Sequence, residues 1–380
     1  MFQMTDDQRD IQNLAREFAE KEVAPIAAEI DVDGHFPQDT VDKLADLGFM
    51  GLCVPEEYGG VGLDSVAEAL VVMELAKVCA STAVICSLHY MVSDIILEKG
   101  TEEQKENYLS RASEGKLGCF CLTEPGAGTD AGGLKTTAVK DGDSYILNGT
   151  KCFITNAGPE QGDHFVVFAL TDPEKKTHGG ITAFLVDRDN PGLSIGKTED
   201  KLGIRASKTS EVILEDCRVS EDAILGEIGE GFKIAMWGLD GGRIGIAAQA
   251  AGIAQGALAE AVNYANERVQ FGKPLSKNQG LQWYIADMAT RTEAARLLVL
   301  EAAQKRADRD ADAGCTAAMA KLFAGEAACY VTDLALQIHG GYGFIKEYPI
   351  ERMYRDARIT RIYEGTSEAQ KMVISRAVLR

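Results

Sequence analysis

The feature that most constrains this fold is a change in sequence texture that occurs twice. Residues 5 to 115 carry apolar residues at three- and four-residue spacing, as in "TDDQRDIQNLAREFAEKEVAPIAAEI", a pattern typical of amphipathic helices. From about residue 118 the apolar residues fall in short runs such as "HFVVFALTD" and "GITAFLVD", which are typical of strands. After "ILGEIGEG" long helical patterns return, roughly over 229–268, 277–308 and 315–338. This order predicts an α+β protein.

The length of 380 residues exceeds what one hydrophobic core usually serves, so more than one domain is expected. The texture divides the chain into an N-terminal all-α domain over 1–117, a middle antiparallel β-sheet domain over 118–226 and a C-terminal helical bundle domain over 227–380. Two shorter helices are predicted near 349–357 and 367–379. Short loops between the C-terminal helices favour antiparallel neighbours.

Three local signals refine this outline. Pro25 interrupts the first helical pattern, because proline cannot continue a helix. Asp141 and Gly142 stand between two strand patterns and predict a type I′ hairpin turn, whose two central residues need positive φ. Ser367 followed by Gln370 matches a capping box, so Ser367 is predicted to cap the last helix.

Charge excludes several classes of partner. The chain has 39 Lys and Arg against 58 Asp and Glu, a net charge of -19 that repels nucleic-acid phosphates and anionic lipids. A basic partner, or a local basic pocket for an anionic ligand, remains open. The longest apolar runs, such as "AVICSLHYMVSDIIL", are interrupted before the ~20 residues that a membrane span needs. The acidic start "MFQMTDDQRD" lacks the layout of a signal or transit peptide, so we expect a cytoplasmic protein with no membrane segment.

Cysteine and histidine usage gives no sign of a metal site. The nine cysteines are scattered without a CxxC pair, and none of the five histidines has the short spacing of structural zinc ligands. Such cysteines are typical of small buried residues in a reducing compartment. We therefore expect no metal.

A glycine-containing segment, "LTEPGAGTD", follows an apolar run, yet it does not predict a dinucleotide-binding fold. In that fold a helix opens at the glycines and meets the pyrophosphate, whereas here the chain continues into the strand pattern "LKTTAVKDGDSYIL". No GxxxxGK[ST] motif occurs either. The segment offers backbone amides and the hydroxyls of Thr123 and Thr129, and "KCFITNA" over 151–157 is similar. Each alone is better explained as a plain connection.

Other short motifs also allow two interpretations. In "ERVQFGKPL", Arg268 and Lys273 are either solvated charges or a grip on a diphosphate, which arginine binds bidentately. "QIHGGYGF" ends a helix with glycines that either cap it or let a ligand approach. "LDGGRIG" places two glycines inside a helical pattern, which indicates close packing against them. Glu364, in "RIYEGTSEAQ", is by composition alone a surface carboxylate near a helix start.

Taken together, these motifs resemble the acyl-CoA dehydrogenases. "LTEPGAGTD", "KCFITNA", "GFKIAMWGLDGGRIGIAAQA", "ERVQFGKPL", "QIHGGYGF", "EYPIERMYRDA" and "RIYEGTSEAQ" carry the resemblance in order over essentially the whole chain, closest to the bacterial butyryl-CoA (short-chain) enzymes. The resemblance implies an N-terminal helical domain, a middle β domain and a C-terminal four-helix bundle. It also implies bound FAD, a homotetramer with flavin contacts from two subunits, and electron-transfer flavoprotein as a separate acceptor.

The resemblance implies a specific reaction. Glu364 would remove the α-proton of an acyl thioester while the β-hydrogen leaves as hydride to flavin N5, giving a trans-2-enoyl-CoA. The backbone N–H of Glu364 and a flavin ribityl hydroxyl would hold the thioester carbonyl, and Tyr363 would pack beside the thioester. Because an α-carbon acid is very weak, we infer that ligand binding raises the pKa of Glu364 by expelling water.

The resemblance also assigns binding residues by position. Substrate contacts would come from Thr129, Asp240, Arg243, Tyr363 and Gly365, with the loop near His178 as a weaker candidate. The flavin ring would meet Phe120, Cys121, Leu122, Thr123, Gly128, Thr129, Phe153, Ile154 and Thr155. The diphosphate and adenosine would be held, partly from a neighbouring subunit, by Arg268, Gln270, Phe271, Gln279, Gln337, Ile338, Gly340 and Gly341, and the contact would continue after the base at Thr366 and Glu368.

Departures from the family pattern bear on the substrate. Isovaleryl and long-chain relatives carry their base at the position of Gly242, so those subclasses are disfavoured here. Trp237 and Gly238 stand where smaller and hydroxyl-bearing residues are expected in butyryl enzymes, and a reshaped acyl pocket could take a cyclic or aryl acyl-CoA. The helix expected to floor that pocket carries Ser87, His89, Tyr90 and Met91, which are more distinctive side chains than a butyryl pocket needs.

Three further functions stay open. The same site run in reverse is an enoyl-CoA reductase, because electron supply and not sequence sets the direction. An oxidase that uses O₂ directly is a second, although the chain is compact compared with the larger acyl-CoA oxidases. A helical scaffold without activity is a third, disfavoured because Glu364 and the flavin-contacting positions are all intact.

Overall fold

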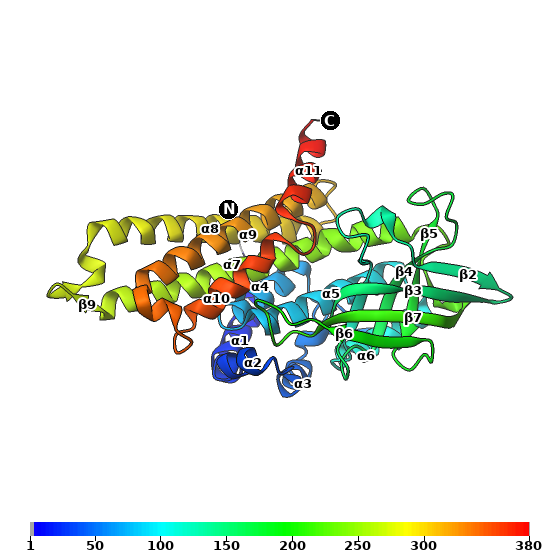
Figure 1. Cartoon of the computed structure of the whole chain (residues 1–380), viewed down its shortest axis with the longest axis horizontal. Coiled ribbons are helices and arrows are strands. Elements are labelled where there is room, and N and C mark those ends of the chain that lie inside the picture. Colours follow the sequence, from blue (N-terminus) through cyan, green and yellow to red (C-terminus); the bar gives the residue numbers. More distant parts are fainter. Residues whose placement is uncertain (1–3, 380) are drawn as a thin grey trace.

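The computed structural model describes residues 4–379, and Figure 1 shows an elongated molecule with helices at one end and a sheet at the other. Thr5 caps the first helix through a capping box, and the helical path breaks around Pro25 as predicted. The N-terminal helices are α1 (Asp6–Phe18), a π-helical turn (Ala19–Val23), α2 (Ala27–Asp33), α3 (Gln38–Asp46), α4 (Ser65–Ala76), α5 (Ala80–Lys99) and α6 (Glu102–Ser113).

Helix α5 is the core helix of this part. It is long and apolar enough to cross a membrane by length and composition, but 89% of its apolar window is buried inside the protein. It packs against α4, α6, the first strand and the long helix α7 (Gly231–Glu267). Its apolar character is therefore explained by burial between the helices and the sheet.

The middle segment forms one sheet with the strand order β6-β7-β3-β2-β4-β5-β8, and β1 pairs with β4. Most neighbours are antiparallel as predicted, but β1 and one residue pair of β2 run parallel to β4. The strands are β1 (Gly118–Cys121), β2 (Thr137–Asp141), β3 (Ser144–Thr155), β4 (His164–Leu170), β5 (Ile181–Asp187), β6 (Leu193–Thr198), β7 (Thr209–Ser220) and β8 (Ile224–Leu225).

The hairpin between β2 and β3 differs from the predicted turn. Asp141 pairs with Ser144, so the central residues are Gly142 and Asp143. Of these two only Gly142 has positive φ, 64°. A type I′ turn needs positive φ at both positions, so that prediction is wrong; glycine at the first central position alone fits type II′.

Alternation along the strands joins the sheet to the helices. In β4, Val166 and Phe168 belong to the large core shared with the helices, whereas Phe165 and Val167 belong to a smaller core within the sheet domain. Successive side chains of a strand point to opposite faces, which explains the division. One face of the sheet therefore continues the helical core towards the middle of the molecule.

The C-terminal part consists of α7, α8 (Gln279–Ala307) and α9 (Ala313–His339), with the shorter α10 (Ile350–Ala357) packed on α9 and α7. Helix α11 (Ser367–Val378) projects away from the bundle (Figure 1). The hairpin of β9 (Val269–Gln270) and β10 (Lys273–Pro274) forms the tip farthest from the sheet. Helix α7 packs on both α4 and α5, so the N- and C-terminal helices share one continuous core.

Candidate active site

The loop that connects α10 to α11 holds Glu364 in an unusual backbone conformation. Glu364 has φ 53° and Gly365 has φ 88°, both in the left-handed region. Gln370 Nε2 donates to the carbonyls of Glu364 and Gly365 at 3.0 and 2.9 Å, and Lys321 Nζ donates to Gly365 O at 2.5 Å. A non-glycine residue keeps such a conformation only where its surroundings fix it, and such strain clusters at functional sites.

These contacts correct the predicted cap of α11. The cap is Thr366, whose side chain accepts from Ala369 N at 3.3 Å, and not Ser367. The Ser367 hydroxyl donates instead to Glu326 at 3.0 Å. The predicted capping box is wrong because Gln370 turns back to the strained loop and supports the backbone at Glu364.

The Glu364 carboxyl lies against helix α7 at Gly242. A Cβ atom at position 242 would stand 2.8 Å from Glu364 Oε2 and 2.6 Å from Met91 Sδ, distances that real Cβ atoms do not show. The glycine is therefore what lets the carboxyl approach the helix. This contact gives a physical reason for one of the two glycines that the sequence places inside a helix, and a Cβ at the other, Gly241, would stand 2.7 Å from the Arg306 guanidinium.

The environment of Glu364 raises its pKa to about 7, because burial disfavours the charged form. Arg243 and Lys321 oppose this shift with their positive charges. Glu364 Oε2 is buried and has no hydrogen-bond partner among the described residues. The inference that ligand binding must raise this pKa by expelling water is therefore wrong in part, because the protein already buries one carboxylate oxygen, Oε2, and that burial raises the pKa before any ligand binds.

Two cations flank the carboxyl. Lys321 is 1% exposed, and burial lowers its pKa to about 8. Arg243 bonds to Asp240 at 2.5 Å, and its Nε is buried without a partner in the described chain. Sequence reasoning assigned Arg243 and Asp240 to the substrate but missed Lys321, although a single lysine within the small-residue run "AAMAKLFAG" was a signal.

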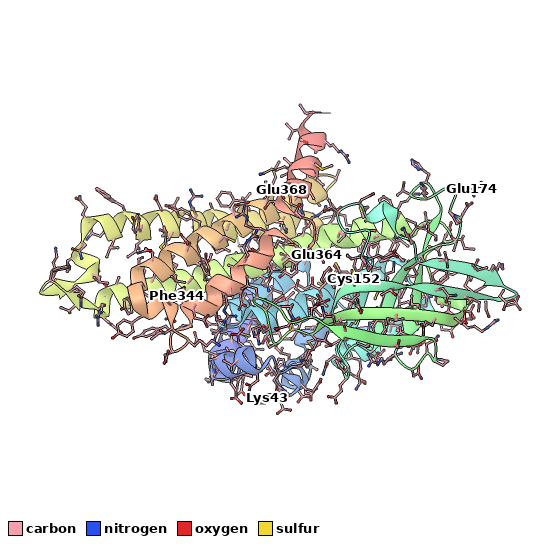
Figure 2. All side chains as sticks on the ribbon, in the orientation of Figure 1. Lys43, Cys152, Glu174, Phe344, Glu364 and Glu368 are labelled. Carbon is pink, nitrogen blue, oxygen red and sulfur yellow. The ribbon has the colours of Figure 1, made fainter. Side chains whose placement is uncertain are left out.

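The neighbouring residues of the loop are also held. The Tyr363 hydroxyl donates to Gln249 Oε1, and Gln249 Nε2 donates to Ala80 O at 2.8 Å on α5. The backbone N–H of Glu364 makes no hydrogen bond within residues 4–379, so it is free to donate to a ligand. Thr366 and Glu368 begin α11 directly after this loop, and Figure 2 shows Glu368 close above Glu364.

The predicted flavin-ring residues come together at the end of β1 and β3. Lys151 Nζ, fully buried, donates to Leu122 O at 3.2 Å and to Glu124 at 2.8 Å, while Cys152 N donates to Thr123 O at 2.9 Å. Sequence reasoning missed this Glu124–Lys151 ion pair. It brings the two segments assigned to the flavin ring side by side; their members are Phe120, Cys121, Leu122, Thr123, Gly128, Thr129, Phe153, Ile154 and Thr155.

The edge of this region is open. A Cβ at Gly128 would meet nothing within 4 Å, and Thr129 is exposed. Phe153 is 63% exposed and has φ 58°, so an aromatic face stands uncovered. A Cβ at Gly238 would lie 3.7 Å from the Phe120 ring, so β1 contacts α7 at Gly238. Gly238 lies one helical turn before Gly242, the residue that Glu364 contacts. This surface therefore adjoins Glu364.

The second predicted group of flavin residues lies elsewhere. Arg268 stacks on the Tyr342 ring at 5.2 Å, and Phe271 is 99% exposed on the β9–β10 hairpin. Figure 1 places this hairpin at the opposite end of the molecule from the sheet, and Figure 2 separates Phe344 from Cys152 in the same way. One chain does not bring the two groups together. Arg268, Gln270, Ile338, Gly340 and Gly341 line one crevice, and Gln279 and Gln337 are exposed nearby.

The structure shows what the residues singled out around the expected acyl pocket contact. The Trp237 ring lies 4.3 Å from the Arg306 guanidinium, and Ile95 fills the space beside Gly238. His89 bonds to Met50 O at 3.0 Å and Tyr90 donates to Phe49 O at 2.7 Å. The hydroxyl of Tyr90 and one ring nitrogen of His89 are therefore bonded to the backbone of residues 49 and 50.

The other two residues of that set, Ser87 and Met91, do face α7. The loop at His178 reaches the turn after β1, where Thr177 lies 2.5 Å from a Cβ placed on Gly132. The His178 Nδ1 atom lies 3.4 Å from the Thr177 hydroxyl. The loop therefore lies at the rim of the flavin-ring segments.

Comparison with known proteins decides the family. The N-terminal, middle and C-terminal domain families of acyl-CoA dehydrogenase match residues 5–116, 119–217 and 229–379. The chain belongs to the acyl-CoA dehydrogenase family. Within this family, acryloyl-CoA reductase (NADH) from Anaerotignum propionicum is 52% identical over 382 residues, which cover 100% of this chain and 96% of the relative.

Two solved structures are close neighbours with full coverage of both chains. Butyryl-CoA dehydrogenase from Megasphaera elsdenii superimposes with a TM-score of 0.97 at 49% identity. A chain solved in work on the electron-transferring flavoprotein of Acidaminococcus fermentans and flavin-based electron bifurcation superimposes with a TM-score of 0.98 at 51% identity. These neighbours confirm the three-part fold and the family membership expected from the motifs.

Proposed function

We propose that this acyl-CoA dehydrogenase oxidises a short-chain or compact acyl-CoA to the trans-2-enoyl-CoA, with Glu364 as the base that removes the α-proton. The observation that carries the proposal is the Glu364 carboxyl itself, which is buried, unpartnered and placed over Gly242 with a pKa of about 7. A base whose pKa lies near the working pH is the best compromise for general base catalysis. The similarity to butyryl-CoA dehydrogenase supports a short acyl chain.

The residues around Glu364 serve the same step. Abstraction of an α-proton puts negative charge on the thioester carbonyl, and a donor fixed in advance stabilises that charge. The free backbone N–H of Glu364 is such a donor, held in place by the bonds of Gln370 and Lys321 to the loop. Tyr363, fixed by Gln249, closes the site beside the thioester. Asp240 and Arg243, with Thr129 and Gly365, are the proposed contacts of the CoA portion.

Bound FAD would supply an acceptor for the β-hydrogen as hydride. The open edge at Gly128 and the exposed ring of Phe153 fit a flat ring beside Glu364. The basic crevice at Arg268 suits the diphosphate, because arginine binds phosphate oxygens bidentately. As the two groups lie at opposite ends of one chain, we infer a homo-oligomer, a tetramer as in the family, in which one copy completes the flavin site of another.

The acceptor and the direction belong to the proposal as well. The sequence contains no nicotinamide-binding motif, so electron-transfer flavoprotein is the proposed partner, in line with the neighbour from Acidaminococcus fermentans. The relative named acryloyl-CoA reductase (NADH) favours a second candidate, the reverse reduction of a short enoyl-CoA by the same residues. Cyclic and aryl acyl-CoAs are further substrates to be compared.

The test is anaerobic reduction of the flavin. The purified protein is expected to be yellow with FAD, and butyryl-CoA is expected to bleach it; branched, cyclic and aryl acyl-CoAs rank the acyl classes. Crotonyl-CoA added to the chemically reduced protein measures the reverse direction, and oxygen consumption without electron-transfer flavoprotein would identify an oxidase. A colourless protein that refuses added FAD contradicts the proposal.

A further inference from the structure

Ser87 places an unpartnered hydroxyl one helical turn beyond the Glu364 carboxyl. A Cβ at Gly245 of α7 would stand 2.1 Å from Ser87 Oγ, as a Cβ at Gly242 would stand 2.8 Å from Glu364 Oε2. Positions three apart on a helix present side chains about 5–6 Å apart, so the two groups are neighbours along α7. Ser87 is 3% exposed, and its Oγ has no hydrogen-bond partner in the described chain.

A small polar crevice begins at this hydroxyl. It is lined by residues of α4, α5, α7 and α8 and offers about 20 Å³ to water, room for roughly one molecule. Met91 lines the crevice and also contacts the place of Gly242, so this flexible side chain separates the crevice from Glu364. The polar residues of the lining are Ser65, Glu68, Ser87, Tyr90, Asp94 and Arg306.

Two charged residues of the lining, Arg306 and Asp94, already bind each other. Arg306 bonds to Asp94 at 3.0 Å and stacks on Trp237 at 4.3 Å. Cys53, Glu68 and Asp94 come within 4.8 Å of one another, as metal ligands could. The guanidinium held on Asp94 argues against a metal ion, because it already neutralises that carboxylate. The Ser87 hydroxyl oxygen is the polar side-chain atom of this lining that is both fully buried and without a hydrogen-bond partner among the described residues.

We propose that Ser87 recognises a hydroxyl group on the fourth carbon of the acyl chain, so that the preferred substrate is a short hydroxyacyl-CoA. This inference rests on the proposed function, since it starts from an α-carbon at Glu364. Two carbon–carbon bonds beyond the α-carbon lead past Met91 towards Ser87. The buried Ser87 hydroxyl has no hydrogen-bond partner within residues 4–379, so an apolar group beside it is disfavoured. A hydroxyl on the ligand can form that hydrogen bond.

The charges of the crevice favour a neutral polar group. Burial already raises the pKa of both the Glu68 and the Asp94 carboxyl, so this crevice disfavours negative charge, and a terminal carboxylate would be disfavoured there in the same way. Arg306 offers little compensation, because Asp94 and the Trp237 ring already hold it. A hydroxyl both donates and accepts, so it can pair with Ser87 and replace the single water that the crevice can hold.

The test compares equilibrium binding of two enoyl-CoA products to the FAD-loaded protein, 4-hydroxycrotonyl-CoA and crotonyl-CoA, by calorimetry. Neither ligand reduces the flavin, so affinity is measured without turnover. The wild-type protein is expected to bind the hydroxylated ligand about tenfold more tightly, the usual worth of one good hydrogen bond. Ser87→Ala is expected to abolish that ratio. Ser93→Ala is the matched control on α5, because its hydroxyl already donates to His89 O at 3.0 Å, and the ratio should persist.

Several results would overturn the inference. Equal affinities in the wild-type protein would do so whether or not the Ser87 variant folds. A preference that survives Ser87→Ala, or is lost equally in Ser93→Ala, would also do so. The proposed function fails separately: in that case neither enoyl-CoA binds and butyryl-CoA does not bleach the flavin, whereas failure of this inference alone leaves bleaching by butyryl-CoA intact.

Discussion

The site at Glu364 and the crevice at Arg268 are opposites in construction. Glu364 is strained, its carboxyl is buried, and Lys321 and Gln370 fix its loop by three hydrogen bonds. At the other end of the bundle, Phe271 is 99% exposed and Phe344 85% exposed. One chain completes the first region, and large exposed aromatics at the second indicate a surface that another copy or a ligand covers.

This difference indicates that the two regions have different functions, catalysis at Glu364 and flavin binding at Arg268. A general base needs a fixed position and a shifted pKa, which the held loop and the burial of Glu364 Oε2 provide within one chain. The diphosphate end of a long cofactor lies far from the reacting atoms, so residues of a second copy can bind it once the oligomer has formed. Variants of the first region should therefore change chemistry with the flavin retained, and variants of the second should change flavin binding first.

The largest effect is expected for Glu364→Gln, which removes the base but keeps the size of the side chain. Turnover should fall by about 10²–10⁴, the usual contribution of a general base, with FAD content unchanged. Stopped-flow flavin reduction measures the rate, and Glu29→Gln, on the exposed surface of α2, is the control. Near-normal rates would place the base elsewhere.

Gly242→Ala comes next, because it displaces the carboxyl without removing it. The new Cβ would stand 2.8 Å from Glu364 Oε2 and 2.6 Å from Met91 Sδ, and both neighbours are flexible side-chain ends. Folding should therefore survive, while a shift of roughly 1 Å at the base lowers the rate of flavin reduction by about a hundredfold. An unchanged rate with a normal thermal midpoint would show that the carboxyl does not work against α7.

Arg268→Ala tests the second region. Loss of a charged contact to phosphate is expected to weaken FAD binding by about 10–100-fold, as charge-assisted hydrogen bonds of this kind contribute about 1.5–3 kcal/mol. Dialysis followed by flavin fluorescence measures the loss. When FAD is added in excess, the rate of flavin reduction should return to normal, which distinguishes this variant from those at Glu364. A rate that stays low would place Arg268 in the chemistry instead.

The smallest effect is a shift of the pH profile. Proton abstraction needs ionised Glu364, so flavin reduction in the wild-type protein should rise with pH through about 7. Lys321 lowers that pKa, and Lys321→Met is expected to move the midpoint upward by about one pH unit. Gly365 O keeps its bond from Gln370 at 2.9 Å, which limits damage to the loop. Lys116→Met, exposed before β1, is the control, and coincident profiles would contradict the role of Lys321.

The raised pKa of Glu364 also makes folding stability depend on pH, but in the opposite direction: stability falls with rising pH, whereas the rate of flavin reduction rises. Folded Glu364 binds its proton more tightly than the ordinary glutamate of an unfolded chain, whose pKa is 4.5. Burial of this carboxyl therefore costs least below about pH 4.5, where both states are protonated, and the cost grows as pH rises towards 7. Glu364→Gln should be more stable than the wild-type protein at pH 8, and the difference should shrink towards pH 5.

Much of the fold was predictable because it rests on local periodicity. The order of helices, strands and helices was confirmed, as was the break at Pro25. The errors occurred where one residue has two available partners. Gln370 fits a capping box by spacing, yet it supports the strained loop at Glu364, and the turn at Gly142 depends on the pairing register and not on the dipeptide alone.

The site was predictable only as a combination of motifs. Glu364 was identified by resemblance, while its pKa, its contact with Gly242 and the cation at Lys321 depend on helices distant in the sequence. Spacing along one helix cannot reveal that Ser87 faces Gly245 across an interface, or that His89 turns away from it. Such facts arise from packing between elements.

Co-expression of two differently tagged variants tests whether Glu364 of one chain works with Arg268 of another. One carries Glu364→Gln and the other Arg268→Ala, and doubly tagged oligomers are purified and assayed at limiting FAD. In a mixed assembly the site that combines intact Glu364 from one chain with intact Arg268 from the other is complete. If the site is shared between chains, the mixed assembly should have activity well above that of either variant alone. Activity no greater than the two variants mixed after purification would contradict it and place both residues in one chain's site.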